Sequence, residues 1–351
     1  MITIISYVTG GLAATLLVLM AAIIMLNTVS GRRIATAKFL RSKMLPVLQE
    51  YLAGNAGEAA VIQELAQDRE IALECLVETS HSLPSPARSR LHYFFDYFRF
   101  TQTLMEEAGN KRWSVCARAI TQLGFTGNRE CIPLLLQALY DEMLDVRLAA
   151  ARALAQLGAG EAVEPILRSL ALPGNLPQQS TAEILYEMGQ VAVAHLLVFM
   201  RKYHRMEDAT ALAIAVRALG LLKADNAAPE IITLLSHPNA EVRLNSARTL
   251  GHIGSPIVIK PLLHRLQDPV WEVRSITVKA LGYLGYPVAI PAIHKALEDT
   301  AWWVRYNAAE ALFRLGETGI SLLKHAMVVH PDRFARDISR QILEEHRAIA
   351  A

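Results

Sequence analysis

Eleven histidines and three cysteines are the residues of this chain that could hold a metal ion or act as nucleophiles. The cysteines (Cys75, Cys116 and Cys131) are odd in number and form no C-x-x-C pair, which favours buried thiols in a reducing compartment over a disulfide framework or a zinc site. No close cluster of Cys, His and Asp has metal-ligand spacing. We therefore predict no catalytic, cofactor-binding or metal-binding residue, and a protein that is not an enzyme.

Charge is distributed unevenly along the chain. The formal net charge is +2, but residues 1–49 hold five basic side chains and no acidic one, so the remainder carries more acidic than basic side chains. Binding to a phosphate backbone depends on clusters of Lys and Arg. We therefore predict no nucleic-acid partner.

The N-terminal segment is apolar. Residues 1–31 contain no charged side chain, and residues 12–26 read LAATLLVLMAAIIML. A helix needs about 20 apolar residues to cross a bilayer, so we expect residues 4–29 to span a membrane and 1–30 to form an anchor. A cleaved signal peptide is the alternative, but it requires basic residues ahead of the apolar core.

The flanking charges predict the orientation of this anchor. All five basic residues follow the apolar segment, where basic residues mark the cytoplasmic side; they are Arg32, Arg33, Lys38, Arg41 and Lys43. We therefore expect a single-pass protein of the bacterial inner (cytoplasmic) membrane, with its N-terminus outside and its body in the cytoplasm. Gly10 and Ala14 form a small-xxx-small pair that would allow a homodimer through the anchor.

A five-residue pattern that begins with an apolar residue and ends in glycine recurs seven times. It ends at Gly127, Gly158, Gly189, Gly220, Gly254, Gly285 and Gly316, at intervals of 31, 31, 31, 34, 31 and 31 residues. A fixed period of this length is typical of stacked helical repeats.

Each period has the anatomy of two antiparallel helices. Steps of four, four and three residues, as in Val304, Ala308, Leu312 and Leu315, give the first helix one apolar face, and the same register predicts that Leu281 is fully buried. The closing glycine suits the left-handed backbone after a helix. A proline then opens the second helix in most periods; these are Pro133, Pro165, Pro229, Pro261 and Pro291.

A second signature precedes several first helices. In four periods an Asp or His stands six residues before an Arg that follows a Val; the pairs are Asp141 and Arg147, His237 and Arg243, Asp268 and Arg274, and Asp299 and Arg305. Together with the pentad and the proline, this pattern over residues 111–330 resembles the HEAT repeat in its short bacterial form, the PBS-lyase HEAT-like repeat.

The resemblance implies an all-α fold, a right-handed α-solenoid of about seven HEAT-like repeats in which neighbours complete each other's core. Residues 31–110 would form a helical region that caps the solenoid, and residues 111–351 the solenoid with a C-terminal capping helix. The resemblance also implies a structural ladder in which each Arg pairs with an Asp of an adjacent repeat, formed by Asp141, Arg147, Arg243, Asp268, Arg274, Asp299 and Arg305. An anion-binding row of arginines is the alternative.

Residues 32–110 lack the pentad but still favour helices, which we expect over 34–52, 57–78 and 86–108. Within them, the aromatic run 93–100 places aromatic side chains on every side of a helix, which indicates burial. The first repeat, the bilayer surface and a partner protein are the candidates for what covers it.

Tryptophans at one register are the candidate partner-binding residues. Trp113, Trp271 and Trp302 each stand two residues before the Val of their repeats, and Trp303 and Tyr306 flank the last of them. Because Trp and Tyr are enriched at binding hot spots, we predict a partner-binding surface made by Trp271, Trp302, Trp303 and Tyr306. The alternative is that the indoles fill the gap between adjacent first helices.

The architecture predicts a non-enzymatic, membrane-anchored scaffold that binds a protein partner at the cytoplasmic face of a membrane, and the anchor suggests a membrane enzyme or a signalling complex. The resemblance offers two alternatives. Bilin lyases and an iron-dependent hydroxylase carry similar repeats, but no histidine here precedes a Glu, as the hydroxylase's iron motif requires. HEAT-like DNA glycosylases bind nucleic acid, which the acidic body disfavours.

Overall fold

The computed structural model describes residues 20, 33–171, 178–204 and 209–350, and every regular element within them is a helix. The chain forms two compact units. Unit 1 contains residues up to 107 together with 125–128, and unit 2 contains residues 108–124 and the chain from 129 onward. For the described part of the chain, the all-helical prediction is confirmed.

Unit 1 is built from a helix through residues 33–53 and from α2 (Glu58–Leu65), α3 (Arg69–His81), α4 (Ser85–Tyr97) and α5 (Phe100–Ala108). The helix expected over 57–78 is divided at Asp68, because the Asp68 side chain accepts hydrogen bonds from two backbone N–H groups and so caps α3. The helix expected over 86–108 breaks at Arg99, whose φ of 54° is left-handed.

The aromatic run 93–100 supplies the core of unit 1. Its four phenylalanines are buried in one apolar cluster, and they are Phe94, Phe95, Phe98 and Phe100. Phe125, from the first pentad, joins the same cluster, while Tyr93 and Tyr97 are exposed. The phenylalanines of the run therefore pack within unit 1.

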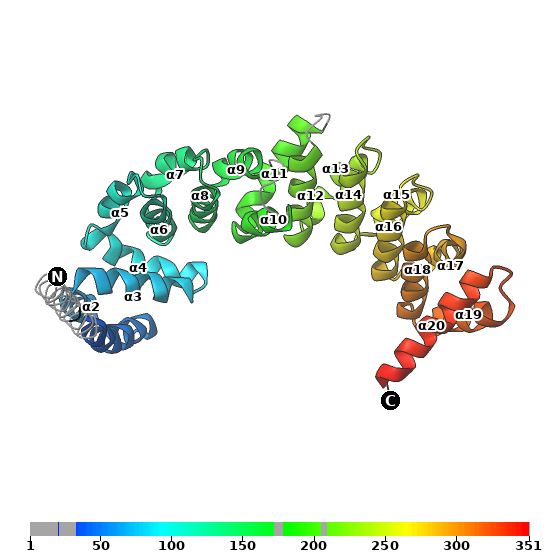
Figure 1. The fold of residues 1–351 in the computed structure, drawn as a ribbon, viewed down its shortest axis with the longest axis horizontal. Coiled ribbons are helices and arrows are strands. Elements are labelled where there is room, and N and C mark those ends of the chain that lie inside the picture. Colours follow the sequence, from blue (N-terminus) through cyan, green and yellow to red (C-terminus); the bar gives the residue numbers. More distant parts are fainter. Residues whose placement is uncertain (1–19, 21–32, 172–177, 205–208, 351) are drawn as a thin grey trace, which may run out of the picture. The chain divides into compact units, whose positions relative to one another are not determined.

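Unit 2 is a stack of helix pairs arranged in two rows (Figure 1). The first helices form one row: α6 (Trp113–Leu123), α8 (Leu144–Gln156), α10 (Gln178–Glu187), α12 (Ala209–Leu221), α14 (Ala240–Ile253), α16 (Trp271–Leu284) and α18 (Trp302–Arg314). The second helices form the other: α7 (Ile132–Ala138), α9 (Val163–Leu170), α11 (Gln190–Tyr203), α13 (Ala228–Leu234), α15 (Ile259–Arg265) and α17 (Ile290–Lys295). They are followed by α19 (Glu317–Val329) and α20 (Arg333–Ala350).

The residue that closes each first helix has a positive φ. This holds for six of the predicted glycines, which are Gly127, Gly158, Gly189, Gly254, Gly285 and Gly316, but in the remaining repeat the residue is Lys223, with a φ of 50°. Gly220, predicted as a helix end, lies inside α12. The 34-residue interval therefore lies between Gly189 and Lys223 rather than between Gly220 and Gly254. It contains the second helix α11, which has 14 residues, whereas the next second helix, α13, has seven.

Gly220, Gly251 and Gly282 occupy the same position in successive repeats and allow consecutive first helices to pack closely. A Cβ at Gly251 would lie 2.6 Å from the Cβ of Ala280 on α16, and one at Gly282 would lie 2.5 Å from the Cβ of Ala311 on α18. Both distances are far shorter than van der Waals contact, so a side chain at either glycine would force the helices apart. The first helices are thus packed backbone to backbone.

Arginines join successive repeats at the loops before the first helices. Arg243 donates from Nε and Nη2 to the carboxylate of Asp268 at 2.7 and 2.8 Å, and Arg274 makes the same pair with Asp299 at 2.7 and 2.8 Å. Each guanidinium also donates from Nη1 to its own loop, Arg243 to the carbonyl of His237 at 3.0 Å and Arg274 to that of Asp268 at 2.9 Å. Bidentate pairs of this kind combine strength with a fixed geometry.

The other ladder residues hold the loops of their own repeats. Arg147 donates to the carbonyl of Asp141 at 2.8 Å, and Arg305 donates to two carbonyls of its own loop. Beyond Arg305, the position that Asp would occupy is taken by His330. Arg336 donates to the carbonyl of His330 at 2.5 Å, so α20 begins as the first helices do.

No helix in the described part of the chain is both long and apolar enough to cross a membrane. The apolar helix α12, for example, has 13 residues and is about 20 Å long, whereas a bilayer core is about 30 Å thick. This finding contradicts the predicted localisation in the bacterial inner membrane. The predicted anchor, residues 1–30, and its Gly10–Ala14 pair lie outside the described residues, Met20 excepted.

We expect Leu281→Ala to lower the free energy of unfolding by about 2–5 kcal/mol, because Leu281 is fully buried, as its register predicts. Urea denaturation followed by circular dichroism measures the loss. Leu221→Ala, at the exposed end of α12, is the control and should change stability by less than about 1 kcal/mol. Equal losses for both variants would contradict the register.

We expect Asp268→Asn to destabilise the chain by on the order of 3 kcal/mol at neutral pH, because the buried guanidinium of Arg243 would face a neutral amide. Burial alone would raise the pKa of the Asp268 carboxyl, but hydrogen bonds from Arg243 and from the N–H of Val270 hold it below its usual value. The carboxylate therefore contributes stability above about pH 4, and this contribution is lost as the pH falls through the lowered pKa of the folded state.

Urea denaturation of both proteins from neutral to strongly acidic pH tests this expectation, and the difference in stability should shrink at acidic pH. Asp337→Asn is the matched control, because Asp337 is exposed and pairs with Arg333 at 3.5 Å, so its loss should cost less than about 1 kcal/mol. A difference that persists unchanged at acidic pH would mean that the carboxylate charge is not the stabilising feature.

Candidate protein-binding surface

Three aromatic side chains lie together at the start of α18. The rings of Trp302 and Tyr306 stack, with centroids 5.1 Å apart and planes at 28°, and Trp303 meets Trp302 edge to face at 4.6 Å. The side chains of Trp302 and Trp303 are 43% and 53% exposed, because they occupy the first turn, before the helix enters the stack. We call these three residues the aromatic cluster.

The other tryptophans at this register are also exposed. Trp271 begins α16 and Trp113 begins α6, and both are open to solvent. Of the four residues predicted from the sequence, the structure gathers Trp302, Trp303 and Tyr306 into one cluster and places Trp271 at the start of the preceding first helix.

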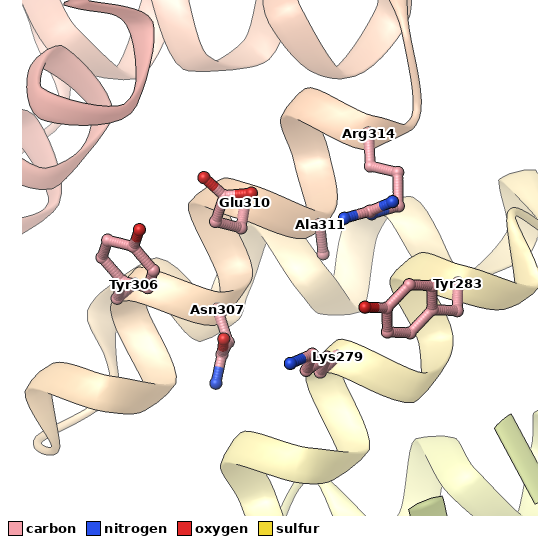
Figure 2. A pocket seen from close by; sticks show the side chains of 7 residues that line it. All are labelled: Lys279, Tyr283, Tyr306, Asn307, Glu310, Ala311 and Arg314. Carbon is pink, nitrogen blue, oxygen red and sulfur yellow. The ribbon is translucent and has the colours of Figure 1, made fainter. Parts of the chain in front are cut away.

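A cavity of about 230 Å³ lies beside the aromatic cluster, between α16 and α18 (Figure 2). Figure 2 shows Lys279 and Tyr283 of α16 on one side, and Tyr306, Glu310 and Arg314 of α18 on the other. A second cavity of about 180 Å³ lies between α14 and α16, where Arg248 and His252 take the corresponding places.

The two cavities adjoin, because Lys279 and Tyr283 line both of them. Ala280 lines the second and Ala311 the first, and these are the residues that the glycines of the preceding helices contact. We call the two cavities together the basic groove. The residues at the close contact between first helices therefore also line the basic groove.

The basic groove collects positive charge. Lys279 Nζ and Arg314 Cζ lie 5.9 and 4.6 Å from the ring centroid of Tyr283. Burial, followed by the charges of Arg248, Arg217 and other cations, lowers the pKa of His252. Burial and Arg217 likewise lower the pKa of Arg248.

These cations are not neutralised by carboxylates. The described residues provide no ion pair for Arg217, Arg248, Lys279 or Arg314. The acidic residue of the groove, Glu310, instead contacts His346 of α20 at 2.8 Å. The groove is therefore lined by three cationic side chains, Arg248, Lys279 and Arg314, and one carboxylate, Glu310.

Two arginines of the ladder, Arg243 and Arg274, do not contribute to this groove. The side chains of Arg243 and Arg274 are only 9% and 14% exposed, and they donate to the carboxylates of Asp268 and Asp299. Their charge is neutralised within the ladder.

Two cations of the groove, Arg248 and Lys279, were not predicted from the sequence. They share a register with Arg217 of α12, which lines neither cavity and donates to Gln179 at 3.0 Å. Arg217, Arg248 and Lys279 recur every 31 residues, and we call them the basic row. The same periodicity that identified the tryptophans could have identified them. The pentad hides this register, because it places the end of the helix at Gly220 rather than at Lys223 and so shifts Arg217 out of register with Arg248.

The three cysteines are free and buried. Burial raises the pKa of Cys75 and of Cys131 to about 11, and burial followed by the charge of Asp141 raises that of Cys116. A neutral thiol is a poor nucleophile. Among the described residues, no group of three His, Cys, Asp or Glu side chains is arranged to hold a metal ion.

Comparisons with solved structures support the same helical fold. The chain is similar to Kap121p, with 13% identity over 86% of this chain and 37% of that one, at a TM-score of 0.56. It is also similar to a chain of the Kap95:Nup1 complex, with 14% identity over 82% of this chain and 45% of that one, at a TM-score of 0.51. The CpcE–CpcF complex of the phycocyanin lyase from Nostoc is 21% identical over 70% of this chain and 94% of that one, but its TM-score is only 0.32.

Sequence comparison identifies the family. No curated protein matches the chain. The family model for HEAT repeats matches residues 101–185, 196–278 and 259–344, which together make up more than half of the chain. With its repeated helix pairs, this chain belongs to the HEAT-repeat family.

Proposed function

We propose that this HEAT-repeat chain is a non-enzymatic scaffold that binds a protein partner through the first helices of unit 2. The observation that carries the proposal is the aromatic cluster, in which Trp302 and Trp303 are exposed and Tyr306 is half-buried, and which borders an open groove. The sequence period of 31 residues favours the short bacterial form of the repeat.

The aromatic cluster has the properties of a binding hot spot. Two of its side chains are indoles at the start of a helix, and stacking on Tyr306 already orders one of them before a partner arrives. Trp and Tyr supply large contact areas and dominate many interfaces. A preordered aromatic surface loses little conformational entropy on binding.

The backbone beneath the cluster is held firmly. Arg274 ties the loop before α18 to the preceding repeat through Asp299, and Gly282 allows α16 to pack directly on α18. A rigid support of this kind favours recognition of a partner over chemistry, and the buried neutral thiols favour the same reading.

We expect the double substitution Trp302→Ala with Trp303→Ala to remove the partner without unfolding the chain, because both indoles are exposed. Affinity capture of the tagged full chain from its own cells, followed by quantitative mass spectrometry, compares the bound proteins. Loss of hot-spot residues should weaken the partner's binding by at least about 2 kcal/mol, roughly thirty-fold.

Tyr93→Ala with Tyr97→Ala is the matched control, because these two aromatic side chains are equally exposed but belong to unit 1. The control should retain the partner. If the tryptophan variant, with an unchanged melting temperature, still captures the same proteins as the wild type, the aromatic cluster is not the binding surface.

A further inference from the structure

We propose that the basic groove binds an acidic segment of the partner, a stretch of chain rich in Asp and Glu. This inference rests on the proposed scaffold function and adds the chemistry of the ligand. It is carried by three observations: an open groove, a row of cations along it and the absence of carboxylates paired with those cations in the described residues.

The geometry of the groove suits an extended chain. Packed helices lie about 8–10 Å apart, and the contacts at Gly251 and Gly282 put the first helices at the close end of that range. Successive cations of the basic row are therefore separated by about one interhelical distance. Side chains on the same side of an extended segment recur every 6–7 Å, roughly, so acidic residues at every second or third position would match the row.

The cations of the groove have no ion-pair partner among the described residues. Unlike Arg243 and Arg274, which neutralise Asp268 and Asp299, Lys279 and Arg314 lie near an aromatic ring. Arg248 donates to the neutral amide oxygen of Asn245 at 3.0 Å, which leaves its charge uncompensated. Placing like charges near one another is unfavourable, and carboxylates from a partner would relieve it. Binding of an acidic segment would thus release a repulsion that the free protein carries.

The aromatic side chains of the groove define where each part of the segment lies. Arg314 and Lys279 lie near the ring of Tyr283, so a carboxylate of the partner that enters the groove could accept hydrogen bonds from both of them. Tyr306 belongs both to the groove and to the aromatic cluster. A segment that places acidic residues over α14 and α16 would therefore place its next residues against Trp302 and Trp303.

An acidic peptide fits this surface better than a nucleic acid. In the register of the basic row, the residue that follows Lys279 is Glu310, and Glu345 of α20 lies near Tyr306, whose hydroxyl is 3.5 Å from that carboxylate. A phosphate backbone carries a charge at every nucleotide and would meet these acids at α18. A peptide can change from acidic to apolar residues at that point.

The test measures binding of a fluorescent peptide of about ten residues that alternates glutamate with serine, long enough to follow the basic row. The full chain is titrated into this probe at low ionic strength and fluorescence anisotropy is recorded. We expect saturable binding that weakens as salt is added, and about ten-fold weaker binding of a matched peptide with glutamine in place of glutamate.

Two charge-reversal variants locate the site. Lys279→Glu with Arg314→Glu changes two exposed residues of the groove, whereas Lys260→Glu with Lys324→Glu makes the same change in net charge at exposed positions of α15 and α19. The groove variant should lose at least about ten-fold in affinity, and the control should lose less than about two-fold. Circular dichroism checks that both variants are folded.

Three outcomes would overturn the inference: no binding of the glutamate peptide, equal losses in the two charge-reversal variants, or tighter binding of a single-stranded oligonucleotide than of the peptide. Cellular capture with the same variants separates this inference from the proposed function. If the tryptophan substitutions release the partner but the groove variant retains it, the scaffold function stands and the acidic segment is wrong. If neither set of substitutions releases it, the proposed function itself fails.

Discussion

The contact between the backbones of consecutive first helices is the constraint on which unit 2 depends. Where Gly251 meets Ala280 and Gly282 meets Ala311, there is no room for even one additional methyl group. Interiors packed this closely transmit position from one element to the next. The separation between first helices in turn sets the width of the basic groove and the spacing of its cations. It also brings Arg243 and Arg274 within reach of the aspartates in the following repeats. The glycines and alanines at these contacts therefore determine both the packing of the repeats and the spacing of the groove's cations.

Arginine has two roles in these repeats, and the surroundings of its guanidinium distinguish them. In the ladder, every donor of Arg243 meets a carboxylate or a carbonyl of the chain itself. In the groove, Arg314 lies over an aromatic ring and has no ion-pair partner among the described residues. In the first arrangement the charge is neutralised by an aspartate and joins two repeats, whereas in the second it remains available to another molecule. The number of arginines in a repeat consequently says little about anion binding, because the position within the repeat decides it.

Much of the fold could be predicted because its signals are periodic. The apolar steps that place Leu281 in the core, and the Val-Arg pairs in the first turn of the first helices, are repeated often enough to be recognised without a structure. The misplaced helix end at Gly220 has a local cause: Lys223 adopts the left-handed backbone usually left to glycine, so the boundary carries no glycine to mark it. In unit 1 no repeat was available, and only the structure reveals that Asp68 and Arg99 interrupt the expected helices. Of the candidate surface, the tryptophans were visible as a recurring residue type. The groove depends on which side chains of two different helices face one another, and that follows from packing rather than from spacing along one helix.

The three additional residues between Gly189 and Lys223 have an evolutionary consequence. Each repeat contains its own capping residues, its own core positions and one half of each contact with its neighbours. Duplication or loss of a whole repeat would therefore preserve every type of contact and change only the number of recognition positions. A shorter insertion cannot be shared among repeats and has to be absorbed locally, as it is here by the long helix α11 in the second row. The row that bears the groove keeps its register. Natural variation in this lineage should consequently alter the groove in steps of one repeat, while shorter insertions and deletions accumulate in the second helices and the loops beside them.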